Sequence, residues 1–132
     1  LARFARLAGE PGQVRFLGSR RDVGRLLGAA DVYWHAGDEG SAPIAVVEAM
    51  AAGVPVVADD TPGCRQALTD GADGRLCPAG ARAARGRATE HLLADASYRG
   101  RLADAARETA GTRFSADRMA DDYARAYRRL LA

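Results

Sequence analysis

The sequence contains no lysine, so all 19 of its basic residues are arginine. These arginines are dispersed among 17 acidic residues, and the resulting net charge of +2 does not indicate a nucleic-acid-binding surface. Together with abundant alanine and glycine, the arginine bias fits a GC-rich, bacterial-like coding sequence. The densest local cluster, Arg82, Arg85 and Arg87, is predicted to be a solvated helix face.

Cysteine and long apolar runs are also scarce. Cys64 and Cys77 lack C-x-x-C spacing, which favours two free thiols in a reduced, cytoplasmic protein, with a lone disulfide as the alternative. No His or Cys group has metal-ligand spacing. No apolar run approaches the roughly 18 residues that cross a bilayer, and no secretion signal is visible at Leu1. We therefore expect no membrane contact from this segment. Because the first residue is not methionine, we expect the natural start to lie upstream.

What is present is a chain of 132 residues with 48 % apolar and 27 % charged residues, as in one ordinary globular domain. Strands are predicted at residues 14–17, 31–35, 54–58 and 75–77. Helices are predicted at residues 1–8 (the tail of one), 23–30, 43–52, 64–69, 83–96, 98–109 and 116–131. This alternation predicts an α/β fold with a Rossmann-like parallel sheet in residues 1–80, followed by C-terminal helices in residues 81–132.

The loop between the second strand and its following helix carries the clearest candidate site. Ligands of open parallel sheets bind at the carboxyl ends of the strands, here after Leu17, His35 and Ala58. The helix that begins near Pro43 offers free N–H groups and the positive end of its dipole to an anion such as a diphosphate. Glu48, among apolar neighbours, needs a partner. That partner is either a vicinal diol, such as a ribose, or a backbone or arginine group of the protein.

The residues around this loop resemble the donor-site signature of GT-B-fold retaining glycosyltransferases of the glycogen-synthase and mannosyltransferase-like family. The signature comprises Asp31-Val32-Tyr33-Trp34-His35-Ala36, Glu39-Gly40, and the run from Ile44 to Ala58 that contains EAMAAGVPVVA. Further matches are Phe16-Leu17-Gly18, Asp70-Gly71, Gly74-Arg75-Leu76 and Phe114-Ser115. The resemblance covers almost the whole chain in register. It implies the C-terminal, nucleotide-sugar-binding domain of such an enzyme.

The resemblance also implies roles for individual residues. In the family, a glutamate matching Glu48 binds the ribose hydroxyls, and backbone amides matching Ile44 and Ala45 bind the diphosphate. The loop after the first F-x-G strand helps to hold the base, which implies Gly18, Ser19 and Arg20. The alternative for that loop is a plain polar turn whose Asp22 caps the following helix.

One position departs from the family pattern. The family has two glutamates separated by seven residues, so the partner of Glu48 should occupy position 40, which is Gly40, while Glu39 stands one residue early. Either a local shift brings Glu39 to the donor sugar as the catalytic-site carboxylate, or Glu39 is an exposed loop residue. Gly40, Ser41 and His35 are predicted at the pocket rim, with a backbone-bonded histidine as the alternative for His35. Trp34 is predicted to be in the core.

Two further strands open this domain in the family, and the Arg and Lys that stabilise the departing diphosphate lie in that opening segment. This sequence contains no counterpart of them, nor of the N-terminal acceptor domain, so we expect a fragment or a chain completed by partners. The absent strands would lie between residues 14–17 and the other three strands. The sheet would therefore lack its middle and expose strand edges.

The first functional hypothesis is a retaining glycosyltransferase that moves a sugar from a UDP- or GDP-sugar to an unknown acceptor, without a bound metal or other cofactor. The fragment alone is expected to have little activity. The alternative hypothesis is a non-catalytic nucleotide-binding or scaffold module derived from the same fold. A flavodoxin-like regulatory domain would require a lysine that this sequence lacks.

Overall fold

A computed structural model describes residues 14–37 and 43–131, and its centre is a three-stranded parallel sheet. The strands are β1 (Tyr33–His35), β2 (Val56–Asp59) and β3 (Arg75–Cys77), in the spatial order β1-β2-β3. Trp34 is paired in register with Val57, and Ala58 with Leu76. The predicted α/β parallel fold is therefore confirmed.

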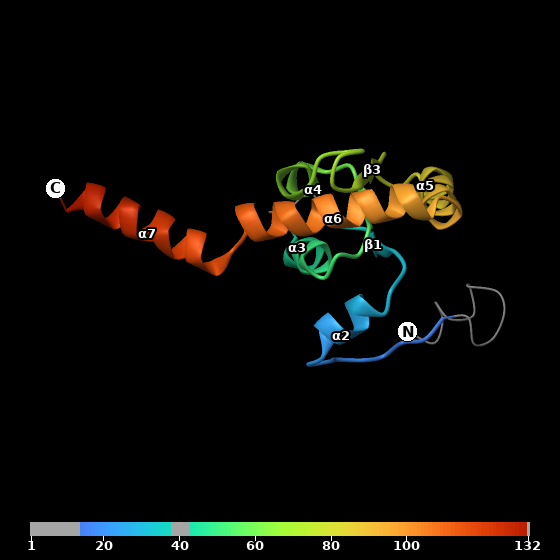
Figure 1. Cartoon of the computed structure of the whole chain (residues 1–132), viewed down its shortest axis with the longest axis horizontal. Coiled ribbons are helices and arrows are strands. Elements are labelled where there is room, and N and C mark those ends of the chain that lie inside the picture. Colours follow the sequence, from blue (N-terminus) through green and yellow to red (C-terminus); the bar gives the residue numbers. More distant parts are fainter. Residues whose placement is uncertain (1–13, 38–42, 132) are drawn as a thin grey trace.

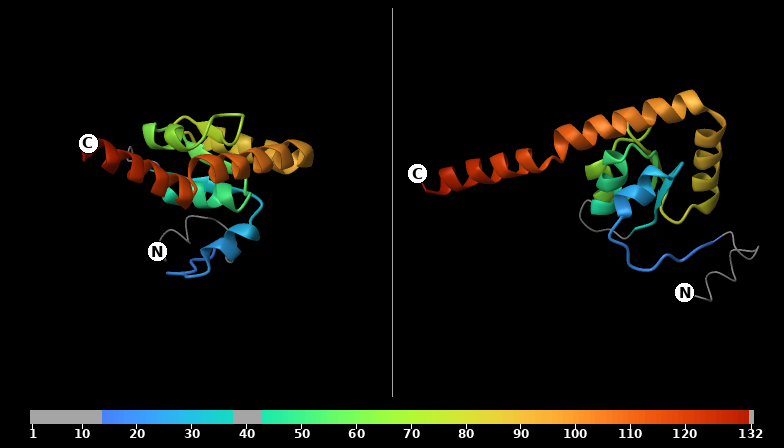
Figure 2. Two further views of the ribbon diagram at one scale, coloured as in Figure 1. Left: turned by 60° about the vertical axis from the view of Figure 1, so that its left-hand side comes forward. Right: turned by 60° about the horizontal axis from the view of Figure 1, so that its bottom comes forward.

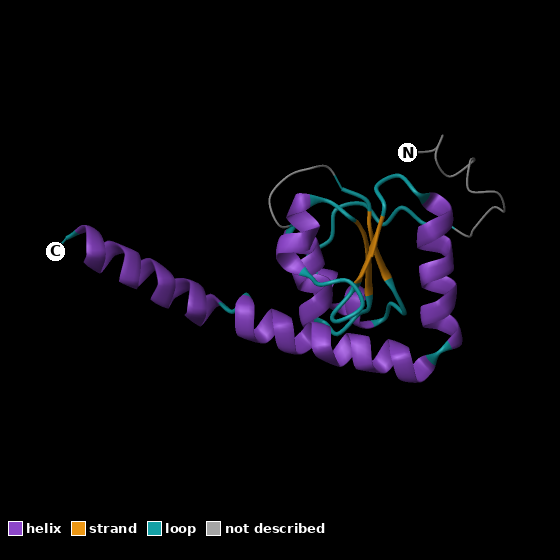
Figure 3. Cartoon of the chain, turned by 90° about the horizontal axis from the view of Figure 1, so that it is seen from above, coloured by secondary structure: helices purple, strands orange, loops and turns teal. Residues whose placement is uncertain are grey.

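Helices cover both faces of this sheet (Figure 3). α3 and α4 lie on one face and α5 on the other, while α6 contacts both α3 and α5. Each strand is followed by at least one helix, as parallel neighbours require. The helices are α2 (Val23–Gly28), α3 (Ile44–Ala51), α4 (Pro62–Ala67), α5 (Arg82–Ala94), α6 (Ala96–Arg113) and α7 (Ala116–Leu130).

The sheet divides the core into two clusters because successive side chains of a strand point to opposite faces. On the α3 side, Val56 and Ala58 pack with Val46, Met50 and other apolar side chains. On the α5 side, Val57 packs with Cys77, Leu92 and Leu102. All four residues of β2 are buried, which explains why Val56, Val57 and Ala58 are apolar without alternation.

Short polar contacts fix the connections. Thr61 caps α4 through the Cys64 amide, and Ser115 caps α7 through the Arg118 amide. The buried carboxylate of Asp73 accepts from the Thr69 amide at 2.6 Å and from the Thr109 hydroxyl at 2.8 Å. These bonds join the loop before β3 to α6.

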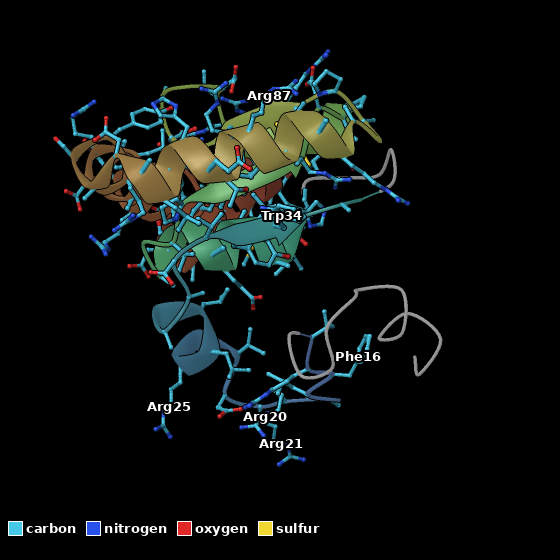
Figure 4. The ribbon with its side chains drawn as sticks, turned by 90° about the vertical axis from the view of Figure 1, so that its right-hand side faces the viewer. Phe16, Arg20, Arg21, Arg25, Trp34 and Arg87 are labelled. Atoms are coloured by element: carbon cyan, nitrogen blue, oxygen red, sulfur yellow. The ribbon has the colours of Figure 1, made fainter. Side chains whose placement is uncertain are left out.

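The prediction of a strand at residues 14–17 is wrong. The segment is irregular, and Phe16 and Leu17 are 48 % and 55 % exposed. A strand needs a hydrogen-bonded neighbour, and no strand of the described chain lies beside this segment. Figures 1 and 4 show it apart from the sheet, on the side of α2. The expected separation from the other three strands is therefore observed.

The last helix, α7, projects away from the rest of the molecule, as Figure 1 and the right-hand view of Figure 2 show. None of its residues is buried. Its apolar side chains share one face, as the sequence predicts, and each is at least 57 % exposed: Met119, Tyr123, Tyr127 and Leu130. The predicted helical tail is therefore present, with its apolar face uncovered.

Two burial predictions are wrong. Trp34 is 52 % exposed because it lies on β1, an edge strand of the described sheet, and its indole N–H donates to Thr89 at 2.6 Å. Arg85 is only 9 % exposed and forms an ion pair with Asp59, so the Arg82–Arg85–Arg87 cluster is not one solvated face. The prediction of free thiols is confirmed, since Cys64 and Cys77 are both unpaired and buried.

Candidate functional site

The N-terminus of α3 lies at the carboxyl end of the sheet, after β1. Pro43 is the N-cap, with φ −73° and ψ 120°, and no side chain caps the helix. The Pro43 carbonyl accepts from the Val46 amide at 3.0 Å, whereas the Ile44 and Ala45 amides have no acceptor within residues 14–37 and 43–131. Helix N-termini with such free amides attract anions. The diphosphate-binding role of these two amides stays a prediction.

Glu48 lies one turn further along α3 and its side chain is exposed. It lines a hollow of about 370 Å³ together with Ile44, Val47, Ala51 and Phe114, which we call the Glu48 groove. Among the described residues, no hydrogen bond or ion pair involves the Glu48 carboxylate. The alternatives of a backbone cap or an arginine partner are thus not realised in this part of the chain, and both carboxylate oxygens are open to a ligand.

His35 and Tyr33 lie beside this site on the same face of β1. The Tyr33 hydroxyl and His35 Nδ1 are 3.4 Å apart. The other ring nitrogen of His35 lies over Gly37, where an added Cβ would be only 2.3 Å away, so a side chain at this position would require the His35 ring to move. Burial, followed by the nearby charges of Glu48 and Cys64, raises the pKa of Tyr33. Tyr33 therefore stays a neutral hydroxyl at the edge of the site.

The predicted base loop does not meet the Glu48 groove. Gly18, with φ +68°, and Arg20 line a separate hollow of about 520 Å³, and Ser19 is exposed nearby. Arg20 donates two bonds to Asp22, at 2.8 and 2.7 Å, which lower the pKa of that carboxyl. Asp22 is the N-cap residue of α2 but its side chain does not cap the helix. Figure 4 shows Arg20 and Arg21 on the side of the segment that faces away from the sheet.

Glu39, Gly40 and Ser41 lie outside the described residues. Within the described ranges, no group of three or more His, Cys, Asp or Glu side chains could hold a metal ion. Over the same ranges, no helix is both long and apolar enough to cross a bilayer.

Two residues of the site were not singled out from the sequence. Tyr33 could have been found, because it stands two residues before His35 and so shares its face of the strand. Phe114 closes the Glu48 groove from the junction of α6 and α7. Only the packing of α6 on α3 brings it there, and no local pattern indicates that packing.

A parallel sheet with a helix N-terminus at the carboxyl ends of its strands is the arrangement at which open α/β domains bind their ligands. The chain matches the family model of group 1 glycosyl transferases over residues 1–109, and it belongs to that family.

Named relatives agree with this assignment. The chain is 33 % identical over 123 residues to the lipopolysaccharide core biosynthesis glycosyltransferase LpsE of Rhizobium meliloti, covering 93 % of this chain and 36 % of the relative. It is 44 % identical over 99 residues to the phosphatidyl-myo-inositol mannosyltransferase of Mycobacterium leprae, covering 72 % of this chain and 26 % of that protein. The chain thus spans about a third or less of either relative.

Solved structures share the fold. Anabaena HepE, crystallised with UDP, matches with a TM-score of 0.91 and 25 % identity over 96 % of this chain and 35 % of that one. Sucrose-phosphate synthase of Thermosynechococcus elongatus matches with the same TM-score at 23 % identity, over 98 % of this chain and 33 % of that protein. The GT-B-type Rossmann-like domain and its helical C-terminal tail are thereby confirmed.

Proposed function

We propose that this chain is the donor-binding part of a retaining glycosyltransferase that uses a UDP- or GDP-sugar. The observation that carries the proposal is that the Ile44 and Ala45 amides and the Glu48 carboxylate, about one helical turn apart on α3, have no hydrogen-bond partner among residues 14–37 and 43–131. The backbone amides of Ile44 and Ala45 would bind the diphosphate, and the Glu48 carboxylate would accept hydrogen bonds from both ribose hydroxyls. HepE, a structural neighbour, has been crystallised with UDP and with UDP-glucose, which supports a nucleotide ligand of this class.

Sugar transfer on this site would rest on placing the donor and stabilising the developing negative charge on the diphosphate. Amides at a helix N-terminus stabilise such charge without reorganising. Tyr33 and His35 would line the side of the site next to Glu48, and Glu39 would approach the sugar. We propose that no protein-bound metal or other cofactor takes part. Activity that survives an excess of chelator would support this point, and its loss would contradict it.

We further propose that these 132 residues transfer little sugar by themselves, because acceptor binding would need a second domain. The proposed setting is the cytoplasm, since two buried, unbonded thiols suit a reducing compartment. The alternative function is a non-catalytic nucleotide-binding or scaffold module, which the replacement of a family glutamate by Gly40 favours.

The decisive experiment is calorimetric titration with UDP-sugars and GDP-sugars. Glu48→Ala should weaken donor binding by about tenfold or more, because hydrogen bonds to a charged group contribute about 1.5–3 kcal/mol. Glu48→Gln, which keeps one acceptor oxygen, should lose less. Glu90→Ala is the control, since Glu90 is an exposed glutamate on α5, away from the groove. Equal affinities for the Glu48→Ala and Glu90→Ala variants would contradict the ribose role.

A full-length protein that binds donor with this dependence yet shows no transfer to any acceptor would favour the scaffold alternative.

A further inference from the structure

A further hollow lies between α5 and the outer strand β3. Figure 4 shows Arg87, one of its lining residues, on the side of α5 that faces away from Trp34. The volume of this hollow is about 340 Å³. We call it the β3–α5 groove. It shares no lining residue with the Glu48 groove, so it is a separate site.

The rim of this groove carries three nitrogen-rich side chains. Arg75 comes from β3, while Arg87 and His91 come from α5. A spacing of four residues places Arg87 and His91 on one side of the helix. Ala84 and Ala88 lie beneath them, and their short side chains leave the space between the rim groups open.

Arg75 is held in place at one end of the groove. It donates to the Tyr98 hydroxyl at 3.3 Å, and its Nε is 3.0 Å from Asp70 Oδ1. The bond to Tyr98 raises the pKa of Arg75, which stays cationic. The His91 ring stacks on the same tyrosine at 4.9 Å. Tyr98 therefore orders two of the three rim groups.

The charge of the groove is only partly compensated. The carboxylate of Asp70 compensates the positive charge of Arg75. Within the described part of the chain, Arg87 has neither an ion pair nor a hydrogen bond. The eight lining residues include no carboxylate. A rim with an uncompensated guanidinium and an imidazole is suited to a small anion with several oxygens.

We propose that the β3–α5 groove binds a phosphate dianion, either inorganic phosphate or the phosphomonoester of a larger molecule. The guanidinium of Arg87 supplies paired N–H donors to two phosphate oxygens. His91 donates one further bond, and Arg75 contributes charge from the opposite wall. The groove is larger than the anion, which leaves space for an organic substituent on a phosphomonoester.

The chain has only two histidines, so proton NMR of their ring C2–H resonances can test the proposal. Inorganic phosphate, titrated at constant pH and ionic strength, should shift the His91 resonance saturably, and chloride should not. A UDP-sugar should shift His35, which lies at the donor site, through a separate binding curve. Failure of one titration is therefore distinguishable from failure of the other.

Arg87→Gln should weaken phosphate binding about tenfold, as loss of one charge-assisted bond predicts. Arg82→Gln is the matched control, because Arg82 is also an exposed arginine of α5 but does not line the groove. It should change the affinity less than about twofold. Circular dichroism of both variants checks folding. An unmoved His91 resonance, an equal response to chloride, or equal losses in the two variants would overturn the proposal.

Vesicles distinguish the two sources of phosphate. Sedimentation with vesicles that contain phosphatidic acid, compared with phosphatidylcholine alone, measures binding to a lipid phosphomonoester. Arg87-dependent binding to soluble phosphate, to these vesicles, or to both would support the site and identify its ligand. If Arg82→Gln reduces vesicle binding as much as Arg87→Gln does, that binding is general electrostatic attraction to the vesicle surface. This result would contradict the proposed phosphate site.

Discussion

The ion pair between Asp59 and Arg85 joins the carboxyl end of β2 to the first turn of α5. Arg85 Nη1 and Asp59 Oδ1 are 3.2 Å apart, and both residues are at most 9 % exposed. The Arg85 guanidinium also lies 5.8 Å from the centre of the Trp34 ring. The sequence predicted a solvated arginine, because a helical pattern does not reveal that Asp59, two residues after Val57, faces α5.

Breaking this pair should destabilise the fold. Arg85→Ala leaves a buried carboxylate without its cation and should lower the free energy of unfolding by about 3 kcal/mol. The double variant Asp59→Leu/Arg85→Met removes both charges and should recover most of that loss. Arg82→Ala, an exposed change on the same helix, is the control. Urea denaturation measures the free energy of unfolding of each variant. Equal decreases in this free energy for Arg85→Ala and for the double variant would contradict the expectation.

The two thiols should be unreactive in the folded protein. Cys64 and Cys77 are 1 % and 4 % exposed, and burial raises the pKa of Cys77 above its ordinary value of 9.0. A thiol-specific chromogenic reagent at pH 8 should therefore detect neither thiol before denaturation and both afterwards. Rapid reaction of one thiol in the native state would contradict this burial.

The same raised pKa has a consequence for stability. The folded state holds the Cys77 proton more tightly than the unfolded state, so its contribution is fully present below pH 9. It is lost as the pH rises through the higher folded-state pKa. Cys77→Ala should flatten this decline in denaturation experiments above pH 9.

At the scale of elements, the turn after α3 depends on Gly53. Its φ of +71° is strained for other residues, and an added Cβ would lie 2.0 Å from the Arg107 guanidinium of α6. Gly53→Ala should lower the free energy of unfolding by about 1–2 kcal/mol. Gly86→Ala is the control, since that glycine lies within α5 with no atom within 4 Å of the added Cβ, and it should stabilise by about 0.5–1 kcal/mol. Thermal unfolding can rank the two, and a more stable Gly53→Ala protein would contradict the expectation.

Most elements could be predicted from the sequence because their signals are local. β3 has the predicted bounds, and α3 ends where Gly53 indicates. α4 begins at Pro62 rather than residue 64, since Thr61 is its cap. The placement of Ile44, Ala45 and Glu48 on one helix could be predicted because it depends on local signals, and their ligand-binding roles stay predictions. The position of Phe114 could not be predicted, because it depends on packing between helices distant in sequence.

At the scale of the whole molecule, α7 adds little to the stability of the rest. It buries none of its residues, and its described side-chain bonds to the body run from Arg118 to the carbonyls of Thr112 and Arg113. Deleting residues 116–132 should therefore shift the unfolding midpoint by no more than about 2 °C, while far-UV circular dichroism falls by the share of a 15-residue helix. A large drop in the midpoint would mean that α7 packs on the body in solution.

The failed strand at residues 14–17 shows what a sequence pattern leaves out at this scale. The apolar residues Val14, Phe16 and Leu17 suit a buried strand, and the prediction followed from them. Strand formation also requires a hydrogen-bonding neighbour, which these residues do not have in the described structure. The exposure of Trp34 has the same origin, because β1 is an edge strand of the sheet formed by the described residues.

The position of Trp34 has a practical consequence. It is the only tryptophan, and its indole connects β1 to α5 through Thr89 while lying close to the buried Arg85. Its fluorescence emission should therefore follow separation of α5 from the sheet. The chain thus contains an intrinsic optical probe of its core layer that needs no added label.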